Sequence, residues 1–185
     1  RARGYLERAL EADPQHPTAL ASLAELRRHS GDVRGAAETI EAMASVPAVC
    51  EQLHLPLQAG SDRTLARMRR GYSAARYLER LAAARAAMRD LAVTSDVIVG
   101  FPGETEADFV QTLEVVEEAA FDAAYTFIFS PRPGTRAAEM VEEFVPETVT
   151  RDRMARLMEV VERSALRRHV ARVGLVEEVL VVLLD

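Results

Sequence analysis

The stretch Ala92-Val-Thr-Ser-Asp-Val-Ile-Val-Gly-Phe-Pro-Gly-Glu-Thr105 decides the fold that the sequence predicts. Its first eight residues are rich in β-branched side chains and predict a strand. Gly100 and Gly103 predict a turn, and Thr105 with Asp108 three residues later has the form of a capping box, which starts a helix. A strand followed by a helix is the unit from which parallel α/β sheets are built.

The same order of strand, loop and helix occurs on either side of this stretch. Shorter apolar runs predict further strands at 53–57 and 123–129, and a last one at 176–184. Helices are expected at residues 61–70, 73–91, 105–120 and 150–172. Strands separated by helices form parallel sheets with right-handed crossovers. We therefore expect an α/β fold, a partial parallel (TIM-like) barrel.

The first 38 residues predict helices only. Leucines from Leu6 to Leu26 recur at spacings of three and four, and prolines and a glycine interrupt them. These dimensions resemble tetratricopeptide repeats (TPR), which need about three units to bury a core. Fewer than two are present, so a helical cap is favoured, and a groove for a protein partner stays open as the alternative.

Composition and charge limit the classes of function. Hydrophobic residues make up 49% and charged residues 28% of the 185, which allows a core and excludes a disordered chain. The net charge of −6 weakly disfavours bulk nucleic-acid binding. All 23 basic residues are arginine, however, and their clusters at 67–70 and 163–172 suit phosphate. No apolar run is long enough to cross a bilayer and no signal-peptide core is present, so we expect a cytoplasmic protein without a membrane partner.

Each of the first three predicted strands ends in a loop that contains glycine and then Ser or Thr, at 58–61, 100–105 and 130–135. In a parallel sheet these loops share the edge where the strands end, and α/β folds bind their ligands there. Glycine lets a backbone approach a ligand, and the amides at helix starts favour anions. Turn and cap requirements would explain one such loop, but three in succession favour a ligand site.

Longer blocks around these loops resemble the radical S-adenosylmethionine (SAM) methylthiotransferases. They are His54-Leu-Pro-Leu-Gln-Ala-Gly-Ser61, Met68-Arg-Arg-Gly-Tyr72, Asp96-Val-Ile-Val-Gly-Phe-Pro-Gly-Glu-Thr105 and Phe127 to Thr135. The branch most similar here is the MiaB type, which adds a methylthio group to isopentenyladenosine beside the tRNA anticodon. After the TPR-like segment (1–38), this resemblance divides the chain into the C-terminal half of a radical SAM barrel (39–172) and the start of an RNA-binding β-barrel of the TRAM type (173–185).

The resemblance implies a transferase that uses SAM and [4Fe–4S] clusters and acts on tRNA. Thiolates hold iron in such clusters, and the family uses a Cys-x-x-x-Cys-x-x-Cys loop. This sequence has one cysteine, Cys50. We therefore expect no cluster, no metal site and no activity from this chain alone. Cys50 is expected to be a small buried apolar residue, and His54 a hydrogen-bonded strand residue rather than a metal ligand.

By the same resemblance, half of a cofactor site is expected at the loops. The SAM side comprises Gln58, Ser61, Val97, Val99, Gly100 and Phe101, and the substrate side comprises Ser130, Arg132 and Gly134. Turn, cap and surface-pairing roles are the alternative for each of these residues. For the whole chain, the alternatives are a TPR-type interaction scaffold that carries an inert half-barrel, and an artificial fusion of two gene fragments.

Overall fold

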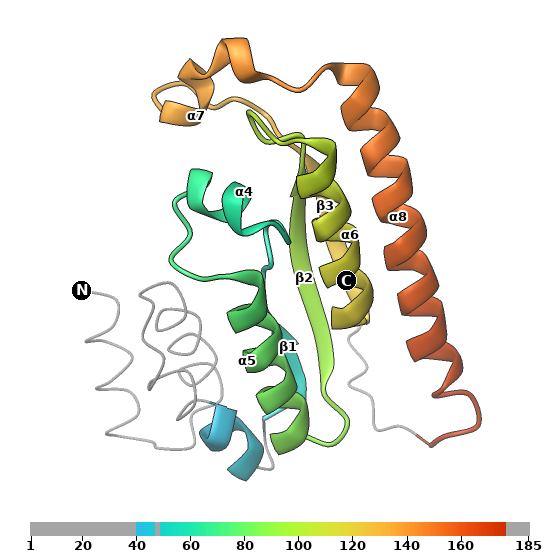
Figure 1. The fold of residues 1–185 in the computed structure, drawn as a ribbon. Coiled ribbons are helices and arrows are strands. Elements are labelled where there is room, and N and C mark those ends of the chain that lie inside the picture. Colours follow the sequence, from blue (N-terminus) through green and yellow to red (C-terminus); the bar gives the residue numbers. More distant parts are fainter. Residues whose placement is uncertain (1–39, 47–48, 177–185) are drawn as a thin grey trace, which may run out of the picture.

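The computed structural model describes residues 40–46 and 49–176. The TPR-like segment predicted for 1–38, and all but the first residue of the strand predicted for 176–184, lie outside this part of the chain. Residues 40–45 are helical. The strands are β1 (Gln52–His54), β2 (Ala92–Val99) and β3 (Ala123–Ile128). The helices are α4 (Asp62–Arg67), α5 (Ala74–Ala87), α6 (Glu106–Ala119), α7 (Arg136–Glu139), α8 (Glu147–Val170) and the 3-10 helix η1 (Val141–Glu143) (Figure 1).

The three strands form one parallel sheet in the order β1-β2-β3, which confirms the α/β prediction for this part of the chain. β1 is shorter than the predicted run at 53–57, because Pro56 has no backbone N–H to donate to the ladder. The pairing resumes beyond it, where Gln58 bridges to Val97 of β2. The strand direction is therefore kept as far as the loop that follows.

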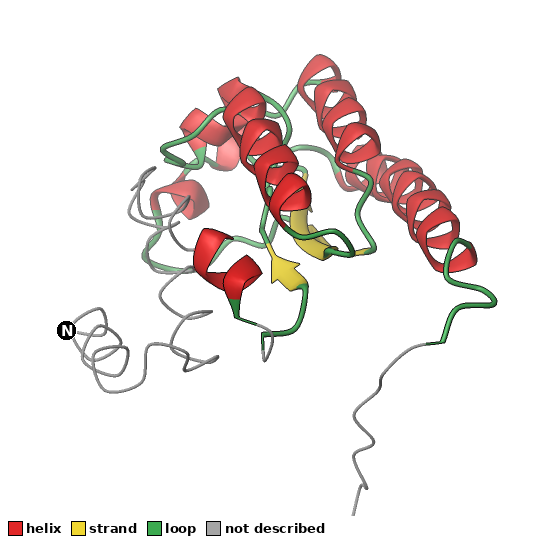
Figure 2. Cartoon of the chain, turned by 90° about the horizontal axis from the view of Figure 1, so that it is seen from below, coloured by secondary structure: helices red, strands yellow, loops and turns green. Residues whose placement is uncertain are grey.

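Helices cover one face of the sheet (Figures 1 and 2). Along β2, burial alternates with a period of two. Val93, Val97 and Val99 belong to the core, which also contains Leu81 of α5, Phe109 of α6 and Leu157 of α8. Each of the three long helices therefore packs its hydrophobic face against the same side of the sheet.

The other face of the sheet is open in the part of the chain that the structure describes. Asp96 and Ile98 lie on this face of β2, and the register pairs them with Tyr125 and Phe127 of β3. Tyr125 is 62% exposed and Phe127 is 50% exposed. In a closed barrel this face would be the interior, so the sheet has the form of a barrel segment.

Side-chain caps fix where the helices begin. Thr105 and Asp108 form the predicted capping box of α6, with both reciprocal hydrogen bonds present. Ser61 caps α4. The helix α7 was not predicted; it is a single turn capped by Thr135 directly after a loop with two prolines. None of the described helices is both long and apolar enough to span a membrane.

The expectation for Cys50 is wrong. Its side chain is exposed, in the connection that leads into β1. Cys50 precedes the first backbone pair of the sheet, Gln52 with Ala92, so no strand or helix face carries it into the core.

Candidate functional site

A cleft of about 850 Å³ lies at the carboxyl ends of the strands, between α4 and α7. Gln58 from the loop after β1, Phe101 from the loop after β2 and Ser130 from the loop after β3 all line it. The three glycine-containing loops therefore converge on one site, as the sequence predicted. This edge is where parallel α/β folds bind their ligands.

The floor of the cleft consists of residues on the open face of the sheet, among them Asp96, Ile98 and Phe127. Val97 and Val99, which were expected beside SAM, lie on the opposite face and are completely buried in the core. Neighbouring residues of a strand point to opposite faces, so Ile98 takes the place expected for the two valines.

Two polar groups of the cleft are oriented by neighbours. The Gln58 side-chain carbonyl accepts a hydrogen bond from Arg70 Nη2 (3.0 Å), which leaves the amide N–H groups as its free donors. Asp96 Oδ2 lies 3.3 Å from His54 Nε2, and His54 Nδ1 lies 2.9 Å from the Thr94 hydroxyl. His54 thus has the hydrogen bonds that were predicted for it as a strand histidine.

Four of the nine predicted site residues line the cleft, namely Gln58, Phe101, Ser130 and Arg132. The other five are Ser61, Val97, Val99, Gly100 and Gly134. The Ser61 side chain is buried and donates to Asp108 Oδ1 (2.6 Å). Gly100 is packed against α8, where an added Cβ would lie 2.4 Å from Thr150 Cγ2. The close backbone approach at Gly100 is therefore to a helix rather than to a ligand.

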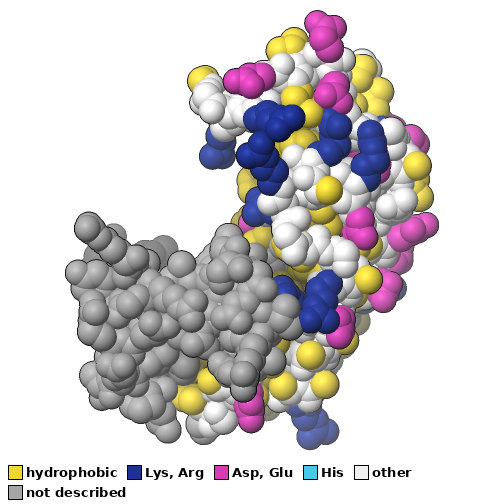
Figure 3. Space-filling model, turned by 60° about the vertical axis from the view of Figure 1, so that its left-hand side comes forward, with side chains coloured by type: hydrophobic (Ala, Val, Ile, Leu, Met, Phe, Trp, Pro, Cys, Tyr) yellow, Lys and Arg dark blue, Asp and Glu magenta, His cyan; other side chains and the backbone are white. Residues whose placement is uncertain are grey.

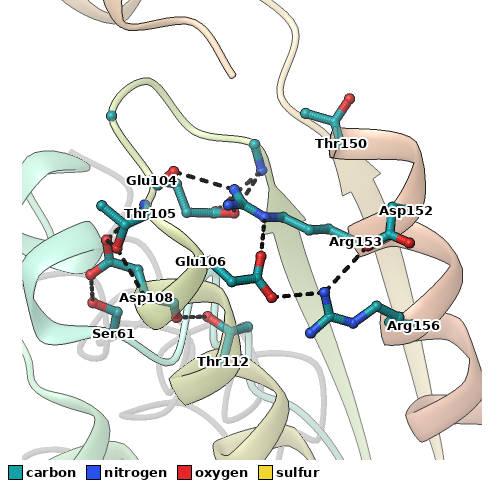
Figure 4. Close-up of polar contacts among 12 residues, drawn as sticks. Ser61, Glu104, Thr105, Glu106, Asp108, Thr112, Thr150, Asp152, Arg153 and Arg156 are labelled. Atoms are coloured by element: carbon teal, nitrogen blue, oxygen red, sulfur yellow. Dashed lines mark hydrogen bonds and ion pairs between the residues drawn. The ribbon is translucent and has the colours of Figure 1, made fainter. Parts of the chain in front are cut away.

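Asp108 joins two of the loops (Figure 4). Its carboxylate accepts hydrogen bonds from Ser61 and from the Thr105 backbone N–H (2.9 Å) and hydroxyl (2.5 Å), and it pairs with Arg63. Burial raises the pKa of Asp108, but the hydrogen bonds from Ser61 and Thr105 and the Arg63 charge outweigh it and lower the pKa to about 2. The ionised carboxylate of Asp108 therefore links the loop at 58–61 to the loop at 100–105.

A buried ion pair holds the loop after β2 against α8 (Figure 4). Glu104 Oε1 accepts from Arg153 Nη1 at 2.8 Å, and the same carboxylate accepts from the Gly100 N–H. Burial raises the pKa of Glu104, and the Gly100 N–H and Arg153 partly oppose this shift. This ion pair was not predicted from the sequence. Its one sequence signal is that Arg153 lies four residues before Leu157, on the buried face of the helix.

Aromatic rings fix the loop after β3. Phe129 contacts Phe101 edge to face, with ring centroids 5.3 Å apart, and Phe144 on its other side at 5.8 Å. Edge-to-face pairs of this kind add stability beyond the area they bury. The row ties the loops after β2 and β3 to the end of η1, and two of its rings, Phe101 and Phe129, line the cleft.

The residues of the cleft fit an organic ligand and do not fit an iron–sulfur cluster. Within the described ranges, no three His, Cys, Asp or Glu side chains are grouped as metal ligands. The only thiol of the sequence, Cys50, cannot supply the several thiolates that such a cluster needs. Phe101, Gln58 and Asp96 instead offer an aromatic surface, an amide donor and a carboxylate acceptor in one cleft.

A parallel sheet with helices on one face and a cleft at the carboxyl ends of its strands is the architecture of α/β-barrel enzymes. Residues 5–116 match the sequence profile of the Radical SAM superfamily, and the chain belongs to that superfamily. The structure is similar to coproporphyrinogen III oxidase from Escherichia coli, a radical SAM enzyme, with a TM-score of 0.59. That similarity covers 69% of this chain and 30% of the oxidase at 17% identity, so it concerns the fold alone.

Curated relatives are more similar in sequence. A protein of Acidothermus cellulolyticus is 54% identical over 144 residues, which cover 78% of this chain and 29% of the relative. A protein of Mycobacterium ulcerans is 47% identical over 184 residues, with coverage of 92% and 34%. Both are named tRNA-2-methylthio-N(6)-dimethylallyladenosine synthase. The chain spans about a third of the length of these relatives.

Proposed function

We propose that this chain is part of a tRNA methylthiotransferase whose target is N6-dimethylallyladenosine beside the anticodon. The 54% identity to the Acidothermus cellulolyticus relative of that name carries the proposal. The site supports it, because an aromatic wall and fixed polar groups at the ends of parallel strands suit a nucleoside-like ligand such as SAM or adenosine. Action on tRNA would place the chain in the cytoplasm.

The proposed roles divide the expected site residues into contact and support. Gln58 and Phe101 would contact SAM, and Ser130 and Arg132 would face the substrate. Ser61 and Gly100 would act through the loops they hold, and Val97 and Val99 through the sheet. Gly134 would shape its turn, since its φ is +81°. The family's [4Fe–4S] cluster would supply redox and sulfur chemistry, with thiolates that these 185 residues do not contain.

We also propose that residues 1–38 form a TPR-like helical segment. The superfamily match begins at residue 5, and the Mycobacterium ulcerans alignment covers 92% of the chain. This coverage includes much of the segment and disfavours the artificial fusion of two gene fragments. The TPR proposal itself, and the protein partner that it would bind, rest on the leucine spacing alone.

A chimera tests the proposed function. This chain replaces the matching segment of the Acidothermus cellulolyticus relative, in a host that lacks the enzyme, and mass spectrometry measures 2-methylthio adenosine in tRNA. We expect modification to be restored. Asp96→Asn, on the cleft floor, should lower it by about tenfold or more, and Arg89→Ala, at the amino end of β2, should not. A chimera that folds and accumulates but leaves tRNA unmodified would contradict the proposal.

A further inference from the structure

The cleft is lined by an unusual number of cations. Five arginines contribute to it, against the single carboxylate of Asp96. They are Arg67, Arg69, Arg70, Arg132 and Arg136. Figure 3, which brings the α4 and α7 side forward, shows arginine side chains gathered in the upper part of this face. The cleft is therefore a cationic region in a chain whose net charge is −6.

Three of these arginines have neither a hydrogen bond nor an ion pair in the part of the chain that the structure describes. Arg67 pairs with Glu143, and Arg70 donates to Gln58. The side chains of Arg69, Arg132 and Arg136 are exposed and have no hydrogen bond or ion pair among the residues described. By contrast, each of the six arginines of α8 lies within 2.5–3.9 Å of a carboxylate oxygen. The arginines of α8 are thus neutralised by carboxylates, whereas Arg69, Arg132 and Arg136 at the cleft are not.

The backbone fixes where the unpaired arginines stand. Arg69 has φ +55°, a left-handed conformation that is uncommon for residues other than glycine, in the turn that ends α4. Across the cleft, the Thr135 hydroxyl donates to the Arg132 carbonyl (2.8 Å) and accepts from the Ala138 N–H to cap α7. The backbones of Arg132 and Arg136 are therefore held on either side of Thr135, opposite Arg69.

The arginines and an aromatic ring of the cleft suit different parts of a nucleotide. A guanidinium is planar and suits phosphate oxygens. The half-exposed ring of Phe127, on the floor between the two walls, suits the face of a base. Cations on both walls and a ring on the floor match a strand of nucleotides better than one small anion.

We propose that Arg69, Arg132 and Arg136 bind phosphates of a single-stranded RNA loop, one of whose bases enters the cleft over Phe127. The choice of RNA as the ligand rests on the proposed function. The inference adds which residues bind the phosphate backbone of that RNA. Phosphate contacts position a nucleic acid without reading its sequence. These three residues therefore orient the loop, and the base is recognised deeper in the cleft.

Fluorescence anisotropy of the full chain with a synthetic RNA stem-loop tests the proposal. The loop carries dimethylallyladenosine, and the association constant is measured over a range of salt concentrations. Arg69→Ala, Arg132→Ala and Arg136→Ala should each weaken binding by about threefold to tenfold. Each should also reduce the slope of log K against log salt by about 0.7, the value for one single-stranded phosphate contact.

Arg89→Ala is the matched control. Arg89 is exposed and unpaired in the described structure, and it lies between α5 and β2, at the end of the sheet opposite the cleft. Its removal changes the net charge equally and should leave affinity and slope unchanged. All four variants should keep the melting temperature of the parent chain, because none of these side chains has a described partner.

The outcomes separate this inference from the proposed function. Cleft variants with the parent's salt slope, or a chain that binds no RNA, would overturn the inference even if the chimera modifies tRNA. A smaller salt slope in the three cleft variants, but not in Arg89→Ala, would support the inference even if the chimera is inactive. Saturable binding of inorganic phosphate that Arg132→Ala abolishes, without RNA binding, would assign a small-anion site and overturn it as well.

Discussion

Arg153 of α8 and Glu104 of the loop after β2 form an almost completely buried ion pair. The Nη1 and Oε1 atoms are 2.8 Å apart, and the side chains are 4% and 2% exposed. The same carboxylate accepts the N–H of Gly100, where the strand ends. The pair therefore sets both the internal shape of this loop and its position on the helix.

Removal of one partner of this pair should be costly. Arg153→Met leaves the Glu104 carboxylate buried without its counter-charge, and we expect the free energy of unfolding to fall by about 3–5 kcal/mol. Arg153→Met combined with Glu104→Gln should cost less, because no buried charge is then left alone. Urea unfolding followed by circular dichroism measures both values.

Arg151→Met is the control on the same helix. Arg151 pairs with Glu147 at the surface, where both side chains are more than 70% exposed, and such pairs contribute less than about 1 kcal/mol. Similar losses for Arg151→Met and Arg153→Met would contradict the importance of the buried pair.

Asp108 should make stability depend on pH in the acid range. Its pKa is about 2 in the folded chain against an ordinary value of 3.8. The folded state thus holds the charged form more strongly than the unfolded state. The resulting stabilisation, about 2 kcal/mol, is present above about pH 4 and is lost as the pH falls toward 2.

Unfolding of the parent chain and of Asp108→Asn should therefore differ most near neutral pH and converge toward pH 2. Asp152→Asn, at an exposed pair with Arg156, serves as the comparison and should show little effect at any pH. A difference between parent and Asp108→Asn that stays constant from pH 7 to pH 2 would contradict the low pKa.

Gly60 lies where the loop after β1 contacts α6. An added Cβ would lie 2.6 Å from the Thr112 Cα and 2.8 Å from the Gln111 carbonyl oxygen. Gly60→Ala should lower the free energy of unfolding by about 1–3 kcal/mol, because backbone must move to accept the methyl group. Gly71→Ala, with open space around the Cβ position, should change it by less than about 0.5 kcal/mol. Thermal unfolding of both variants distinguishes close packing from a general effect of glycine replacement.

The isolated chain should not assemble a [4Fe–4S] cluster. After anaerobic reconstitution with iron and sulfide, we expect far fewer than four irons per chain, because one thiolate cannot hold the cluster. Cys50→Ala should give the same iron content as the parent. A brown protein with a full cluster, whose absorbance disappears in Cys50→Ala, would contradict this expectation.

The order of the strands and helices could be predicted from local sequence. Which side chains of β2 point into the core could not. The β-branched run at 92–99 and the capping box at Thr105 are local signals, and the structure has both features. Val97, Ile98 and Val99 are all apolar, however, so the sequence does not show which of them faces the helices. Only the packing of α5, α6 and α8 places the two valines in the core and Ile98 on the cleft floor.

The contacts that hold the site were not predictable, because they join residues far apart in the sequence. Ser61 and Asp108 are separated by 47 positions, and Glu104 and Arg153 by 49. The caps at Ser61 and Thr105 were expected from residue type, but their second roles toward Asp108 depend on how the two loops meet. The cysteine at position 50 was misjudged for a related reason, since a small apolar residue is buried only where an element carries it inward.

The dependence of the Gly100–Glu104 loop on α8 also has a consequence during translation. A ribosome adds roughly 5–20 residues per second, so about 2–10 s separate the synthesis of Glu104 from that of Arg153. During that interval the Glu104 carboxylate stays hydrated, because α8, against which the loop packs, has not yet been made. A nascent chain could pair its three strands before then, but the loop after β2 is fixed only when α8 has been made.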